Sequence, residues 1–157
     1  MSSNIPAPDA DVVAFQAAMT RLLRWASRPS VAEDLAGPAA AGLSPTDLWL
    51  LDGVVRYGPV RMGDLAGWQG VDKSTVTTQL RRLVEKDLVT RGPSPADRRV
   101  VLVRATEEGR RLQESVTRAG AAVLQALVAD WSPADRRRFA DLFGRFAARL
   151  GEDPTPR

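Results

Sequence analysis

The sequence predicts a mainly α-helical protein with one small β-hairpin. Apolar residues recur every three or four positions in several segments between residues 9 and 150, and helix-capping residues precede most of these segments. Two short runs rich in β-branched residues lie close together between residues 88 and 104 and are interpreted as strands. The 157 residues show no internal repeat and no interdomain linker, so we expect one domain.

The N-terminal part is expected to hold a loose tail, residues 1–8, followed by one long helix over residues 9–27. Pro29 is expected to end this helix. Its apolar face consists of Val12, Phe15, Met19, Leu22, Leu23 and Ala26. Residues 29–43 are rich in Ala, Gly and Pro, and we expect a short helical turn around residues 31–35.

A capping motif predicts that the next helix begins at Pro45. Ser44 is the expected N-cap, Pro45 takes the first helical position, and Asp47 is placed to bond back to the cap as a capping-box acid. The sequence Gly58-Pro59 is expected to end this helix. Its apolar face consists of Leu48, Leu51 and Val55.

Residues 64–84, DLAGWQGVDKSTVTTQLRRLV, meet the requirements of a helix-turn-helix. Such a unit needs a small residue on its first helix, a turn residue four positions later and an apolar anchor six beyond that. Ala66, Gly70 and Val76 satisfy these requirements in order. We predict helices over residues 62–68 and 72–86, the second capped by Asp72 and buried along Val76, Leu80 and Leu83.

A hairpin is predicted to follow, with strands over residues 88–91 and 100–104 and turn chemistry in Gly92-Pro93-Ser94-Pro95. Two long helices are predicted after it. The first opens at Thr106-Glu107-Glu108, with the stripe Leu112, Val116, Ala119, Val123 and Leu127. The second opens at Ser132-Pro133 and ends at Gly151, with the stripe Phe139, Leu142, Phe143, Phe146 and Leu150.

Positive charge is concentrated in the helix-turn-helix and the hairpin. Residues 61–104 carry a net charge of +4, whereas the remainder of the chain carries −1. Because a helix-turn-helix followed by a basic hairpin is the arrangement of a winged helix, this clustering is a better indication of phosphate binding than the Arg content alone.

The helix predicted over residues 72–86 has a face suited to DNA. With its apolar stripe facing inward, Ser74, Thr78, Arg81, Arg82 and Glu85 point outward, and Thr75 and Thr77 lie on the flanks. Short hydroxyl side chains permit close approach to base edges in the major groove, and Arg can reach phosphate or guanine. The alternative is a solvated polar face on an ordinary amphipathic helix.

Over roughly residues 10–150 the chain resembles the MarR family of dimeric winged-helix regulators. The matching sequences are LSPTDLWLL at 43–51, the helix-turn-helix above, STVT at 74–77, LV at 88–89 and ADRRVVLVRATEEGRRL at 96–112. The resemblance implies a winged helix-turn-helix with N- and C-terminal dimerisation helices, in a single domain over 1–157. Residues 44–105 would form the DNA-binding part, and residues 9–28 and 106–150 the dimerisation helices.

The resemblance also implies a homodimer that binds a palindromic operator in double-stranded DNA, with repression as the usual outcome. Ser74, Thr75, Thr77 and Thr78 would face the major groove, Arg81 and Arg82 the DNA backbone, and Arg98 and Arg99 the minor groove. Asp97 would orient a wing arginine or fix the hairpin. The alternative for residues 97–99 is a solvated charged turn.

Three positions depart from the pattern of the family. Thr78 stands where many members have a basic residue, and Asp87 where many have the Gly that ends the recognition helix. Since Asp tolerates a left-handed conformation moderately well, we expect the fold to survive this change. Arg61 stands where the family usually has a Thr-type cap, which affects that local cap only.

Members of the family commonly bind small aromatic or phenolic anions between the dimerisation helices and the winged helix. The resemblance therefore implies a possible effector pocket here, with the candidate residues Phe15, Met19, Arg21, Trp25 and Trp49. Ordinary packing is the alternative for all five, and Trp25, Trp49 and Trp68 are expected in the core rather than in a ligand site.

Composition excludes several functions. The chain has no Cys and no His, which excludes zinc sites, cysteine redox sensing and hydrolysis by Cys or by a Ser-His pair. We therefore expect no cofactor, no metal and no catalytic residue. The absence of a long apolar run and of signal-peptide features predicts a cytoplasmic protein without a membrane partner. The alternative function is a winged-helix protein-interaction module without specific DNA binding.

Overall fold

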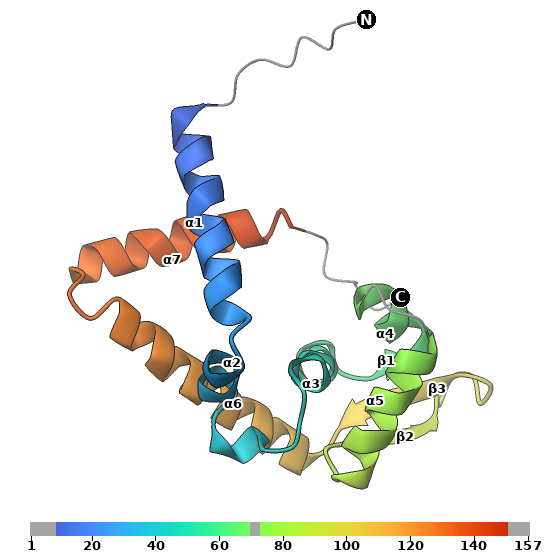
Figure 1. Cartoon of the computed structure of the whole chain (residues 1–157). Coiled ribbons are helices and arrows are strands. Elements are labelled where there is room, and N and C mark those ends of the chain that lie inside the picture. The colour runs from blue at the N-terminus through green and yellow to red at the C-terminus, as the bar shows by residue number, and fades with distance from the viewer. Residues whose placement is uncertain (1–8, 70–72, 151–157) are drawn as a thin grey trace, which may run out of the picture.

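The computed structural model describes residues 9–69 and 73–150 and confirms the mainly helical fold with a small sheet. In chain order the elements are α1 (Ala10–Ala26), α2 (Pro29–Ala36), the 3₁₀ turn η1 (Pro38–Ala40), α3 (Pro45–Tyr57), β1 (Val60–Arg61), α4 (Met62–Gln69), α5 (Lys73–Glu85), β2 (Val89–Pro93), β3 (Val101–Ala105), α6 (Glu107–Leu127) and α7 (Pro133–Ala147). Figure 1 shows α1 crossing α7 at one end of the molecule, α3, α4, α5 and the sheet at the other, and α6 between them.

Helix starts follow the capping residues predicted from the sequence. Ser44 and Asp47 form a complete capping box, in which the Ser44 N–H donates to Asp47 Oδ2 (2.9 Å) and the Asp47 N–H donates to Ser44 Oγ (3.2 Å). Thr106 caps α6 and Ser132 caps α7 through their hydroxyl oxygens, which accept the N–H of Gly109 and of Asp135. The predicted cap Asp72 and turn residue Gly70 lie outside the described residues.

The hydrophobic core lies in the winged-helix half of the molecule. Its fully buried large side chains are Leu50, Leu51, Val54, Val76, Leu80, Leu83, Val89 and Val103. The predicted stripe of α5 is therefore confirmed, and the small Ala66 of α4 is buried beside it. By contrast, α1 and α7 contribute no fully buried residue, although both carry apolar stripes.

The sheet has three antiparallel strands in the order β1-β3-β2, one more than predicted. β1 pairs Val60 with Val103 and Arg61 with Leu102, and a strand of two residues is too short to show alternation in the sequence. The prediction of a turn at Gly92-Pro93 is wrong. Gly92 pairs with Leu102 and Pro93 with Val101, because β2 is an edge strand and an edge tolerates the missing N–H of proline.

Two predicted helix limits also differ. Pro29 does not only end α1; it opens α2, a helix of eight residues instead of one turn, because proline suits the first helical position. α7 ends at Ala147 rather than at Gly151, which lies outside the described residues. No helix in the described part of the chain has the length and apolar character needed to cross a membrane.

The junction between α5, β2 and α6 depends on two special backbone positions. Asp87 has φ 55°, so this residue adopts the left-handed conformation expected where the family has Gly, and the Leu88 N–H bonds back to the Leu83 carbonyl oxygen at 2.9 Å. The Thr106 hydroxyl donates to the Asp87 carbonyl oxygen at 2.6 Å. A Cβ on Gly109 would collide with the Leu88 carbonyl group, so only glycine allows α6 to approach this closely.

Candidate nucleic-acid interface

α5 turns its apolar stripe into the core and its hydroxyl residues toward solvent. Ser74, Thr77 and Thr78 are exposed and Thr75 is half-buried, as the helical projection predicts. The Thr78 hydroxyl donates to the Ser74 carbonyl oxygen one turn earlier at 3.1 Å. This bond leaves the methyl group of Thr78 and the lone pairs of its oxygen as the features that a base edge would meet.

The two arginines of α5 have different surroundings. Arg81 is exposed, and its Nε lies 3.8 Å from Oε1 of Glu85, which is also exposed. Such a surface pair is weak, so the Arg81 guanidinium can readily exchange it for a phosphate. Arg82 is half-buried and donates two hydrogen bonds to Asp47 Oδ1, from Nη2 at 2.7 Å and from Nε at 3.3 Å.

Asp47 is a buried carboxylate at the start of α3, with its side chain only 2% exposed. Burial would raise the pKa of this carboxyl, but the hydrogen bond from Arg82 and those from the backbone N–H and hydroxyl of Ser44 outweigh it. The pKa of Asp47 therefore lies below its ordinary value of 3.8. The same hydrogen bond and ion pair raise the pKa of Arg82. The pair is charged at neutral pH.

The wing is the tip of the hairpin, residues 94–100, and its shape is held by short polar contacts. The Ser94 N–H donates to the Val100 carbonyl oxygen at 2.8 Å and closes the tip. Asp97 receives the Arg99 N–H on Oδ1 (2.9 Å) and the Val100 N–H on its backbone oxygen (3.0 Å). Of the two roles expected for Asp97, these contacts support the one that fixes the hairpin.

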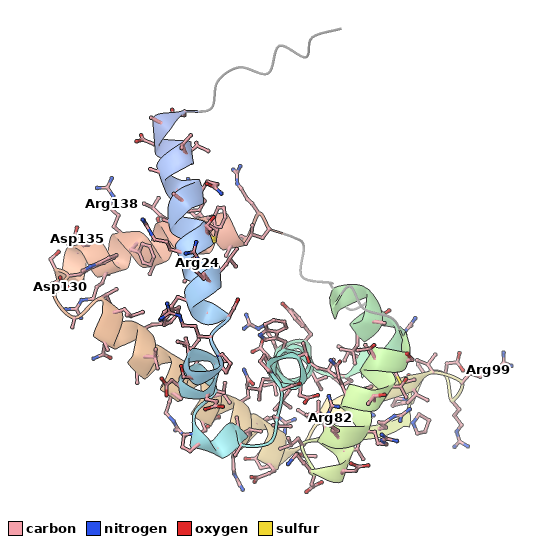
Figure 2. All side chains as sticks on the ribbon, in the orientation of Figure 1. Arg24, Arg82, Arg99, Asp130, Asp135 and Arg138 are labelled. Carbon is pink, nitrogen blue, oxygen red and sulfur yellow. The ribbon has the colours of Figure 1, made fainter. Side chains whose placement is uncertain are left out.

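Both wing arginines are exposed at this tip. Arg98 and Arg99 form no ion pair among the described residues. Figure 2 shows Arg99 at the outer end of the hairpin, pointing away from the body of the molecule. A tight turn thus carries two exposed cations.

The five candidate effector residues lie on two helices, four of them on α1 and Trp49 on α3. Phe15 packs edge-on against Phe146 of α7, with ring centroids 4.9 Å apart. Arg21 is exposed, Met19 and Trp25 are half-buried, and all three lie on α1. Trp49 is 62% exposed on α3, so its expected place in the core is wrong for the single chain. The Trp68 side chain is outside the described part.

A hollow of about 420 Å³ lies elsewhere, between α3 and α6. It is lined by Val55, Arg110, Gln113, Glu114, Thr117 and Arg118. The Gln113 side chain donates to Asp52 Oδ1 at 2.8 Å, while its own carbonyl oxygen is buried and accepts no hydrogen bond from the described residues. None of these residues was identified from the sequence as part of a ligand site, because they come together only when α3 packs on α6.

Comparison with known proteins agrees with this geometry. The MarR family profile matches residues 43–101, from the end of the η1 loop to the start of β3. The HTH-type transcriptional regulator YdgJ of Bacillus subtilis (strain 168), itself uncharacterised, is 31% identical over 107 residues. That match covers 68% of this chain and 65% of YdgJ, so the chain spans about two thirds of the length of this relative.

Solved structures share the fold over most of the chain. RV1404 from Mycobacterium tuberculosis superposes with a TM-score of 0.71 at 23% identity, covering 96% of this chain and 100% of RV1404. FabT from Streptococcus pneumoniae, solved in complex with DNA, gives a TM-score of 0.63 at 19% identity, covering 89% of this chain and 95% of FabT. At these identities the likeness concerns the fold.

The helix-turn-helix, the three-stranded sheet and the basic hairpin define a winged helix-turn-helix protein. With the profile match and the relatives above, the chain belongs to the MarR family of transcriptional regulators, which is not a family of enzymes.

Proposed function

We propose that this chain binds double-stranded DNA as a homodimer, with α5 in the major groove and the wing in the minor groove of each half of a palindromic operator. The observation that carries the proposal is the joint exposure of the hydroxyl face of α5 and of the two wing arginines. The hydroxyl residues Ser74, Thr75, Thr77 and Thr78 would contact base edges, and Arg81 would contact phosphate.

A dimer is supported by the apolar surface that α1 and α7 leave uncovered. The exposed large side chains on these two helices include Val12, Val13, Phe15, Leu22, Leu23, Phe139, Leu142 and Phe143. Contiguous apolar surface of this kind marks an interface in a soluble protein. A two-fold dimer covers it and places two copies of α5 for two half-sites, as a palindrome requires.

The test is selection of duplexes from a randomised pool by the purified protein, followed by a salt series on a selected duplex and on a random duplex of equal length. We expect a palindromic consensus, and an affinity for random DNA that falls steeply with salt because counterions are released from phosphates. A protein-interaction module would enrich no sequence and show no steep salt dependence, and that result would refute the proposal.

We further propose that the protein acts as a repressor and that a small aromatic or phenolic anion releases it from DNA. The hollow between α3 and α6 supports this, since its lining combines the apolar Val55 with two arginines, Arg110 and Arg118, against one carboxylate, Glu114. Benzoate should displace the protein from the selected duplex, whereas benzyl alcohol should not. Equal effects of the two compounds would contradict an anion-specific site.

A further inference from the structure

Asp47 links α3 to α5 through its ion pair with Arg82. It occupies the first turn of α3, and Arg82 occupies the last turn of α5, 35 residues later. Oδ1 accepts both hydrogen bonds from Arg82, and Oδ2 accepts the Ser44 N–H at 2.9 Å and the Ser44 hydroxyl at 2.7 Å. Both carboxylate oxygens are therefore fully used.

The core contacts that α5 makes through its apolar stripe lack direction. Val76, Leu80 and Leu83 exclude water, but packing of this kind tolerates small rotations of a helix about its axis. Two charge-assisted hydrogen bonds from one guanidinium have a defined geometry and hold one rotation of α5. Figure 2 shows Arg82 on the side of α5 that faces α3.

Moving Arg82 away from Asp47 would destabilise the folded protein. Moving the guanidinium to a DNA phosphate would strand a carboxylate whose side chain is 2% exposed, and a buried charge without its partner is strongly destabilising. The neighbouring Arg81 can leave its partner without this penalty, because Glu85 is exposed to solvent and lies 3.8 Å away. Two adjacent arginines of one helix thus have different tasks.

We propose, on the basis of the DNA-binding function above, that Asp47 and Arg82 are positioning residues. Their ion pair sets the rotation of α5 in the major groove and so determines which base edges the hydroxyl residues reach. This role replaces the phosphate contact expected for Arg82 from the sequence. Asp47, identified from the sequence only as a helix cap, becomes a determinant of sequence specificity.

The test compares Arg82→Gln and Asp47→Asn with the matched control Arg81→Gln, using the duplex selected by the wild-type protein and a random duplex. For Arg82→Gln and Asp47→Asn we expect the ratio of selected to random affinity to fall about tenfold, the size of one lost base contact. For Arg81→Gln both affinities should fall by the same factor, and the salt slope should decrease by about one.

Asp47→Asn best distinguishes a phosphate-binding role of Arg82 from a positioning role. If Arg82 were a phosphate ligand, removal of Asp47 would free it and tighten binding to both duplexes. If the pair positions α5, the selected duplex is bound more weakly and the ratio falls. Tighter binding to both duplexes, together with Arg82→Gln behaving like Arg81→Gln, would overturn the proposal.

Two further variants guard against loss of folding. Ser44→Ala removes part of the α3 cap but keeps the ion pair, so it should lower the melting temperature and leave the ratio unchanged. Arg82→Lys keeps the positive charge but cannot donate the same pair of hydrogen bonds to Asp47. The ratio of selected to random affinity should therefore fall while the salt slope stays constant. A normal ratio in Arg82→Lys, or a loss in Ser44→Ala equal to that of Asp47→Asn, contradicts the inference. Failure of the wild type to select any duplex would refute the proposed function and this inference with it.

Discussion

Asp87 shows how a single residue can end a recognition helix without glycine. Its φ of 55° is left-handed, a conformation that costs most residues about 1–2 kcal/mol but that Asp and Asn tolerate through their short polar side chains. We expect Asp87→Ala to lower the free energy of unfolding by about 1 kcal/mol and Asp87→Gly to leave it equal or higher. Urea denaturation of the three proteins measures this difference. Equal losses for Ala and Gly would show that the aspartate side chain, not the backbone, matters.

Glycine is needed at position 109 because α6 packs closely against the backbone of Leu88, and not because of an unusual φ. Because a Cβ there would collide with the backbone carbonyl of Leu88, we expect Gly109→Ala to lower the free energy of unfolding by about 2 kcal/mol or more. Gly67→Ala is the matched control, since an added Cβ there meets no described atom within 4 Å beyond its chain neighbours and its own helix backbone. That variant should be neutral or gain up to about 1 kcal/mol from the better helix propensity of Ala. Similar urea midpoints for wild type and Gly109→Ala would contradict this packing.

At the scale of elements, the wing has a hydrogen-bonded backbone and two exposed arginines that form no ion pair with the described residues. Arg98→Ala and Arg99→Ala should each weaken binding to the selected duplex by about 1–3 kcal/mol and leave the melting temperature unchanged. Arg138→Ala is the control for the lost charge, because Figure 2 places Arg138 at the opposite end of the molecule. It should change affinity little. A large loss of thermal stability in either wing variant would indicate a structural role instead.

The contact between α3 and α5 gives a pH dependence of stability. The pKa of Asp47 lies below 3.8 in the folded protein, so its carboxylate contributes fully to stability above about pH 5. The contribution is lost as the pH falls through 3.8 toward the lower folded value, because protonation breaks the bonds from Arg82.

Between pH 5 and pH 3 the free energy of unfolding should therefore fall more in the wild type than in Asp47→Asn. Urea denaturation at several pH values measures both curves, and the other carboxylates affect the two proteins equally. Parallel curves would show that the buried ion pair contributes nothing in this range.

At the scale of the whole molecule, the apolar side chains are divided into two groups. Those of the winged-helix half form a closed core. Outside it, α1, α7 and the α6–α7 loop carry a row of rings in which Trp131, Phe139, Phe143, Phe146 and Phe15 contact one another in turn. All of these rings except the half-buried Phe146 are exposed. Light scattering should give twice the 17.0 kDa of one chain at micromolar concentration.

Leu142→Glu should shift this mass toward that of one chain, since Leu142 is 48% exposed in the middle of α7 and would be buried in the dimer. Val84→Glu is the control, a comparably exposed apolar residue on α5, and should leave the mass unchanged. A wild-type mass near 17 kDa would refute the dimer.

Local features of the sequence were sufficient to predict most of the elements. The capping box at Ser44 and the stripe of α5 depend on residues within a few helical turns, so their signals are complete in a short stretch of chain. The left-handed conformation at Asp87 is expected from the resemblance to the family instead. The candidate DNA-contacting residues of α5 follow from the same periodicity, because the buried face of a helix determines its outer face.

Only the tertiary structure decided the features that depend on distant residues. The pairing of Gly92 and Pro93 with β3, the exposure of Trp49 and the bond from Arg82 to Asp47 each arise when segments far apart in sequence pack together. The sequence around Asp47 and around Arg82 carries no signal that shows whether the two side chains form an ion pair. Packing brings these two within 2.7 Å, and burial then makes their ion pair costly to break.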